Sequence, residues 1–188
     1  MPSLRWLPLP LAVLAVSAYA TSYLDAEQAR QVLFPGVTFE QLPFGLNPAQ
    51  AAAIAAQAGL PVRVRQLRLW RGAGGELVLV DEVIGKHDRI TYALGLNPDG
   101  TVKGIEIMDY RESYGHEVRG AAWRGQFIGK AVGAQLRVDE DIRNIGGATL
   151  SCRHVTEGVR RLLATWDIAL RPLSKKTAGP ASDALPHA

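Results

Sequence analysis

The segment NIGGATLSCRHVTEGVRRLL, from Asn144 to Leu163, joins two stretches of opposite character. Its first part is small and flexible, with Gly146, Gly147 and Ala148 leading to Thr149. In the second part, apolar residues recur at the three- and four-residue spacing of one helical face, which predicts a long helix over residues 151–169. These apolar residues are Val155, Val159, Leu162 and Trp166.

A glycine pair that opens onto a helix has two interpretations. Small residues let backbone N–H groups approach an anion closely, and the N-terminus of a helix favours a phosphate group. The alternative is an ordinary flexible turn followed by a helix that begins with Thr and Ser. This stretch alone is consistent with both.

Upstream of this segment the apolar period changes to that of β-strands. Alternating or continuous apolar runs separated by short turns predict four strands, and the turn at residues 97–100 predicts a hairpin. Short connections favour antiparallel pairing. We therefore expect an α+β fold with a mainly antiparallel sheet flanked by helices. The predicted strands cover residues 62–70, 76–85, 88–96 and 101–112.

Two helices are predicted before the sheet. Asp25 followed by Gln28 forms a capping-box pattern, and Asn47 followed by Pro48 marks a second helix that Gly59 ends. The chain then divides into four segments. They are a signal peptide at 1–20, N-terminal helices and a first strand at 21–75, a main domain at 76–169 and a disordered tail at 170–188.

The first twenty residues have the order of a secretory signal. Arg5 precedes an apolar run, and Ala18-Tyr19-Ala20 supplies the small-x-small pattern of a cleavage site. The apolar run is short for a membrane span, which needs about 20 residues, although an uncleaved anchor is the alternative. A cleaved signal and an uncleaved anchor both predict that the folded part lies outside the cytoplasm, in the periplasm or an equivalent compartment. The anchor would also attach it to the membrane.

Charge and cysteine content narrow the function classes. The formal net charge of +3 comes from the two ends of the chain, and the part between them is close to neutral. We therefore predict no nucleic-acid partner, because such proteins carry clustered basic residues on the folded part. A single cysteine, Cys152, cannot form an internal disulfide.

Catalytic and metal-binding patterns are weak. Thr149, Ser151 and Cys152 lie near His154, but no G-x-S-x-G elbow accompanies them. The histidines form neither an i, i+4 pair nor a C-x-x-C-H pattern, so we predict no metal site. Cys152 is expected to pack as a small apolar side chain. The residues considered as metal or haem ligands are His87, His116, His154, Glu112 and Glu117.

Two motifs resemble the extracytoplasmic FMN-binding domain family. That family includes the NqrC and RnfG subunits of ion-translocating electron-transfer complexes and smaller stand-alone proteins, which this chain resembles more. Gly147-Ala148-Thr149, followed by Leu150-Ser151, resembles its SGAT-x-[ST] signature. Upstream, the family has a strand, a turn like E-T-P-G-L-G and then W-x-x-x-F-x-G-K. The corresponding residues here are 104–110, 112–116 and 123–130.

The resemblance implies a site. In the family, a flavin transferase attaches FMN through a phosphoester bond to the threonine of the GAT triplet, which is Thr149 here. The FMN-binding residues it implies are Thr149, Gly146, Gly147, Ala148, Ser151, Glu112, Tyr114 and Gly115. His116 and Trp123 are further candidates beside the flavin ring, and Arg143 and Arg153 beside the phosphate. Gly146 stands where the family usually has Ser, and Arg143 where an acidic residue is frequent.

The function implied is that of an exported flavoprotein that passes electrons between redox partners without a substrate of its own. A membrane or periplasmic donor and acceptor are the expected partners, together with the flavin transferase that installs the FMN. Two alternatives are an FMN-dependent reductase with its own small-molecule substrate, and a sensory or assembly module of the same fold without cofactor.

Overall fold

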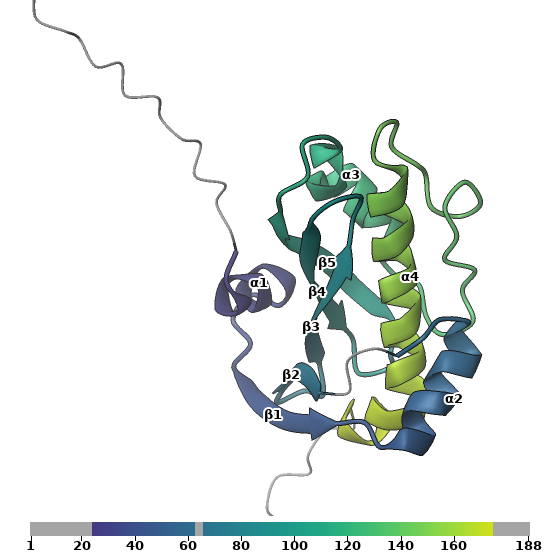
Figure 1. The fold of residues 1–188 in the computed structure, drawn as a ribbon. Coiled ribbons are helices and arrows are strands. Elements are labelled where there is room, and N and C mark those ends of the chain that lie inside the picture. Colours follow the sequence, from purple (N-terminus) through teal and green to yellow (C-terminus); the bar gives the residue numbers. More distant parts are fainter. Residues whose placement is uncertain (1–23, 63–65, 175–188) are drawn as a thin grey trace, which may run out of the picture.

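A computed structural model describes residues 24–62 and 66–174, which form an antiparallel sheet with helices on both faces. Five strands pair in the order of the sequence, β1-β2-β3-β4-β5. In Figure 1, α1 lies on one side of the sheet and α4 on the other. The strands are β1 (Phe39–Gly45), β2 (Gln66–Gly72), β3 (Leu77–Ile84), β4 (Arg89–Leu96) and β5 (Val102–Tyr110). The α-helices are α1 (Ala26–Leu33), α2 (Pro48–Ala58), α3 (Ala121–Arg124) and α4 (Thr149–Thr165).

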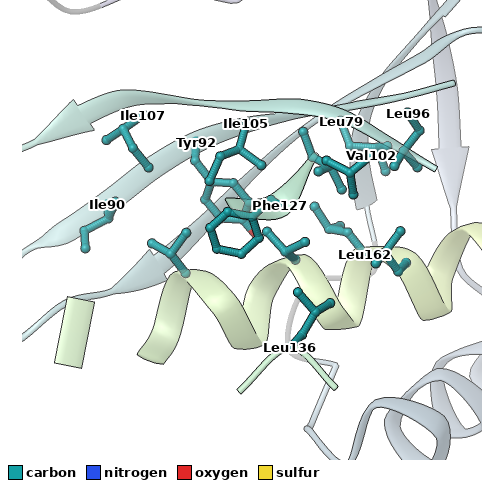
Figure 2. Packing of buried hydrophobic residues seen from close by; sticks show 14 of the residues in the cluster. Leu79, Ile90, Tyr92, Leu96, Val102, Ile105, Ile107, Phe127, Leu136 and Leu162 are labelled. Carbon is teal, nitrogen blue, oxygen red and sulfur yellow. The ribbon is translucent and has the colours of Figure 1, made fainter. Parts of the chain in front are cut away.

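The first half of β3 is buried on both faces of the sheet, which explains its continuous apolar run. Successive side chains of a strand point to opposite faces. Accordingly, Leu77 and Leu79 belong to the core under α4, whereas Val78 and Val80 belong to the core under α1. Figure 2 shows the larger core, where side chains of the sheet and of α4 meet. The antiparallel α+β fold expected from the sequence is confirmed.

The predicted helix ends are confirmed for α1 and α2. Asp25 and Gln28 form a complete capping box at α1, as do Asn47 and Gln50 at α2. Gly59 ends α2 in the left-handed conformation that glycine adopts without strain. Helix α2 packs beside α4, where Ile54 and Ala164 share a small apolar cluster.

Two features differ from the sequence-based expectation. The sequence pattern does not predict strand β1, because Pro43 and exposed polar residues interrupt its apolar alternation. Proline is tolerated in this strand because β1 lies at the edge of the sheet, where its missing N–H leaves no partner unpaired. The second difference is the end of the chain. Residues 166–170 continue α4 as a π-helix, and Arg171–Ser174 form a 3-10 turn, with Trp166 donating to Ser174 Oγ at 2.8 Å. A disordered tail beginning at 170 is therefore wrong for residues 170–174.

Three expectations concern segments outside the described residues. The signal peptide at 1–20, the start of the first predicted strand at 63–65, and the tail beyond 174 all lie there. In the described part, no helix combines the length and apolar content needed to cross a bilayer. The boundary expected at residue 75 lies in the turn between β2 and β3, which pair with each other, so both segments share one sheet.

Helix α4 approaches the sheet most closely at Gly158. A Cβ there would lie 2.3 Å from the hydroxyl oxygen of Tyr92, which is fully buried. That hydroxyl donates to Asp81 Oδ2 at 2.9 Å, and Arg161 of α4 pairs with the same oxygen at 2.6 Å. Burial raises the pKa of Tyr92, and the Asp81 carboxylate raises it further, so the phenol keeps its proton. This network attaches α4 to β3 and β4.

We expect Gly158→Ala to lower the free energy of unfolding by about 1–3 kcal/mol, because the methyl group displaces a packed hydroxyl. In a Tyr92→Phe background the penalty should be at least about 1 kcal/mol smaller, because the oxygen that the methyl group would displace is gone. Urea unfolding of the four proteins measures both values. Equal penalties in the two backgrounds would contradict this account of the packing.

Candidate functional site

The glycine pair leads into an α4 N-terminus that has no side-chain cap. Gly147 takes a left-handed φ of +81°, and Ala148, the N-cap residue, has no oxygen to offer the first turn. Thr149 is the first helical residue, two positions earlier than expected. The N–H groups of a first helical turn have no partner within the helix and carry partial positive charge. This turn can therefore accept an anion.

A carboxylate holds the loop that delivers this turn. Asp141 Oδ2 pairs with Lys130 Nζ at 2.7 Å, and the same side chain accepts from the backbone N–H groups of Leu136 and Arg137. Burial acts to raise the pKa of Asp141, but Lys130 and the two N–H groups outweigh it and the pKa is lowered. Lys130 is the last residue of the W-x-x-x-F-x-G-K motif, so this motif anchors the loop.

The first residue of the same motif also holds the loop. Trp123 is buried, stacks edge-on against Phe127 and donates from Nε1 to the carbonyl of Arg143 at 2.9 Å. Gln126 Oε1 accepts from the backbone N–H of Arg143 at 2.7 Å. Trp123 is therefore a core residue that holds the loop. It was a candidate neighbour of the flavin ring, but it does not line the cavity at the start of α4.

A cavity of about 330 Å³ lies at the start of α4. Three segments form its walls: the β3–β4 turn, the turn after β5, and the first residues of α4 with the glycine before them. Lys86, His87, Glu112, Ser113, Tyr114, Gly147, Ala148, Thr149, Leu150 and Ser151 line it. Another cavity, of about 410 Å³, lies between α2 and α4 and contains none of these residues.

The structure thus brings together residues 112–114 and 147–151, which are far apart in the sequence. Gly146 and Gly115 do not line the cavity. Lys86, His87, Ser113 and Leu150 do, although they were not among the implied FMN-binding residues. The turn at 85–88 could be recognised between two strands, but its position opposite α4 depends on the tertiary fold. Arg143 and Arg153 are exposed and do not line the cavity.

Gly115 acts behind the cavity wall. A Cβ at this position would lie 2.1 Å from the Cβ of Ala148 and 2.8 Å from the hydroxyl of Tyr110, and the residue has a φ of +82°. Only glycine satisfies both the close approach and the left-handed backbone. The two motifs therefore touch directly, backbone against side chain, at Gly115 and Ala148.

Glu112 holds the β3–β4 turn, which forms one wall of the cavity. It is 6% exposed, and its Oε1 accepts from the backbone N–H groups of His87 at 2.7 Å and Asp88 at 3.1 Å. Burial acts to raise the pKa of Glu112, but these backbone donors, together with that of Lys86, lower it. The carboxylate is therefore ionised at neutral pH and fixes the turn that carries Lys86 and His87.

Three nucleophilic side chains lie at the start of α4, and their environments differ. The Ser151 side chain is 2% exposed and lies 3.2 Å from the hydroxyl of Tyr110, which donates to the Tyr114 carbonyl at 2.6 Å. Cys152 is fully buried, and burial raises the pKa of its thiol. Thr149 is half-buried on the cavity wall. Thr149 and Ser151 both line the cavity, and Thr149 is the more exposed of the two.

The histidines considered earlier as ligands serve other contacts. His154 Nδ1 contacts the carbonyl of Ile84, and the ring of His116 packs edge-on against Tyr110 at 5.5 Å between centroids. Over residues 24–62 and 66–174, no three side chains of the His, Cys, Asp and Glu types converge in a way that could hold a metal ion.

Comparisons with known proteins agree with this geometry. Residues 85–164 match the family model described as the FMN-binding domain. Among solved structures, the crystal structure of Shewanella oneidensis NqrC is similar, with a TM-score of 0.50 and 15% sequence identity. The similarity covers 79% of this chain and 89% of that one, which establishes a common fold. No curated protein sequence matches the chain.

We expect Glu112→Gln to lower the free energy of unfolding at pH 7 by about 1–3 kcal/mol, because an amide accepts more weakly from two backbone donors in a buried position. The folded-state pKa of Glu112 lies below the unfolded value of about 4.3. Its stabilisation is therefore complete above that pH and disappears as the pH falls through the lower folded-state value.

Urea unfolding at pH 7, 5 and 3 measures the difference between the two proteins, which should be smaller at pH 3 than at pH 7. Glu82→Gln is the control, because Glu82 forms only an exposed pair with Arg89 and should change stability little at any pH. An effect of Glu112→Gln that stays constant down to pH 3 would contradict a stabilising role of the ionised Glu112 carboxylate.

Proposed function

Residues 85–164 belong to the FMN-binding domain family, and from this premise we propose that the protein is an electron carrier with FMN held covalently on Thr149. One observation carries the proposal. The hydroxyl of Thr149 lies at the uncapped start of α4, on the wall of a cavity that the β3–β4 turn and the turn after β5 complete.

The residues present fit such a group at its phosphate end. A Cβ at Gly146 or Gly147 would meet nothing within 4 Å, so the loop before Thr149 leaves open space there. The N–H groups of the first turn of α4 would donate to a phosphodiester, which keeps one negative charge. Lys86, in the β3–β4 turn that forms another wall, would add positive charge.

The residues present also fit the ring of a flavin. Tyr114 is 77% exposed and Leu150 is 38% exposed, although both line the cavity. Exposed apolar side chains in a concave site are typical of ligand contacts. We propose that these two side chains flank the isoalloxazine and exclude water from part of it.

FMN supplies the redox chemistry, because its ring accepts and releases electrons singly or in pairs. The chain contributes attachment, orientation and electrostatics. Thr149 tethers the group, Glu112 keeps the Lys86–His87 turn in place, and the contact of Gly115 with Ala148 keeps the walls together. The cavity is partly open to solvent, which suits electron exchange with partner proteins better than enclosure of a substrate.

Location and partners complete the proposal. We propose that residues 1–20 direct export, and that a membrane or periplasmic donor and acceptor exchange electrons with the flavin. The fold shared with NqrC supports a place in membrane-associated electron transfer. A flavin transferase would be the partner for maturation. A covalent bond prevents loss of the cofactor in a compartment where it cannot be replaced.

We expect the protein, coexpressed with a flavin transferase, to gain the mass of one FMN less one water on the peptide that contains Thr149. Thr149→Ala should abolish this gain, because the exposed hydroxyls of Ser113 and Tyr114 belong to another wall of the cavity and not to the uncapped first turn of α4. Ser151→Ala should retain it, since the Ser151 hydroxyl is buried against Tyr110. Peptide mass spectrometry measures all three.

Other outcomes would support the alternatives. Modification of Ser151 instead of Thr149 would contradict the residue assignment but not the function. Colourless protein with no added mass would favour a module without cofactor. Noncovalent FMN with turnover of a small-molecule acceptor by the isolated protein would favour a reductase.

A further inference from the structure

Asn144 makes the one hydrogen bond to the Thr149 hydroxyl within the described residues. Its Nδ2 lies 3.2 Å from Thr149 Oγ1, and its Oδ1 accepts from the backbone N–H of Ile145 at 2.9 Å. The second bond fixes the orientation of the amide, because a flipped side chain would point its NH₂ at a backbone donor. Asn144 is therefore a donor to Thr149.

This bond has a consequence for the threonine. A hydroxyl has one proton to donate and two lone pairs. Asn144 occupies one lone pair, so the Thr149 proton and the other lone pair stay available on the cavity side. Threonine also has few χ1 positions in a helix, because its β-carbon is branched. A donor at a fixed point selects one of them.

The backbone next to Asn144 is itself held in place. The preceding residue, Arg143, makes two backbone hydrogen bonds: its carbonyl accepts from Trp123 Nε1 and its N–H donates to Gln126 Oε1. Trp123 is buried in the main core. A chain of contacts thus runs from the core through the Arg143 backbone and the Asn144 amide to the hydroxyl of Thr149.

We propose that Asn144 is a positioning residue that orients the Thr149 hydroxyl for transfer of the flavin phosphate, an inference that rests on the proposed function. In this step the Thr149 oxygen attacks the phosphorus on the riboflavin side of a flavin dinucleotide. The new P–O bond forms, the P–O–P bridge breaks, adenylate leaves with the bridging oxygen, and a base takes the hydroxyl proton. Asn144 remains unchanged and holds the attacking oxygen.

The test uses purified full-length protein, a purified flavin transferase and flavin dinucleotide. Asn144→Ala removes both amide bonds. Asn144→Asp keeps the bond to the Ile145 N–H but replaces the donor to Thr149 by a negatively charged acceptor, which also repels the phosphate. Glu140→Ala is the matched control, because Glu140 lies in the same loop and its side chain pairs only with Arg137 at the surface.

We expect kcat for flavin transfer to fall about fivefold to tenfold in Asn144→Ala and by at least as much in Asn144→Asp, the effect of one lost orienting hydrogen bond. KM for the protein should stay unchanged, because Asn144 is half-buried and its amide is directed at Thr149. Glu140→Ala should match the wild type. The aspartate variant should also keep the wild-type free energy of unfolding, which separates positioning from stability.

A second measurement needs no transferase. Three-bond coupling constants of the Thr149 side chain, measured by NMR in the protein without FMN, should show one χ1 rotamer in the wild type and averaging in Asn144→Ala. Unchanged transfer kinetics in both variants would overturn the inference, as would an effect confined to KM or an unaltered rotamer. A wild-type protein that gains no FMN on Thr149 refutes the proposed function itself, and this is visible before any variant is compared.

Discussion

The contact between Gly115 and Ala148 is the constraint on which the site depends. It brings the turn after β5 so close to the start of α4 that position 115 has no room for a side chain. Because α4 is also attached to β3 and β4 through Gly158 and the Asp81–Arg161 pair, its first turn has little freedom to move. The cavity is the space left where these fixed segments meet.

Two carboxylates hold the loops around the cavity in place by accepting hydrogen bonds from their backbones. Glu112 and Asp141 both accept from successive backbone N–H groups. Both have a lowered pKa because these donors, joined by Lys130 in the case of Asp141, outweigh burial. Both carboxylates are therefore ionised at neutral pH and cannot act as general acids. Their role is to hold the Lys86–His87 turn and the loop before α4 in place.

Local signals in the sequence predicted much of the fold. The capping residues of α1 and α2, the antiparallel strands β3 to β5 and the long C-terminal helix were identified because each depends on nearby residues. Strand β1 was missed, since an edge strand with exposed polar side chains lacks a regular apolar pattern. The helical turn at Arg171–Ser174 was missed because its order comes from the contact with Trp166, which the local sequence does not reveal.

The sequence by itself determined that Thr149 lies between a flexible glycine pair and a long helix, and that the chain carries the motifs of an FMN-binding domain. Only the tertiary structure decided which side chains share the cavity. It placed Lys86, His87 and Leu150 on the walls, buried Ser151 and Cys152, moved Trp123 into the core and set Asn144 beside the hydroxyl. The physical reason is that burial and hydrogen-bond partners depend on how β3, β5 and α4 pack, and that packing joins residues more than sixty positions apart.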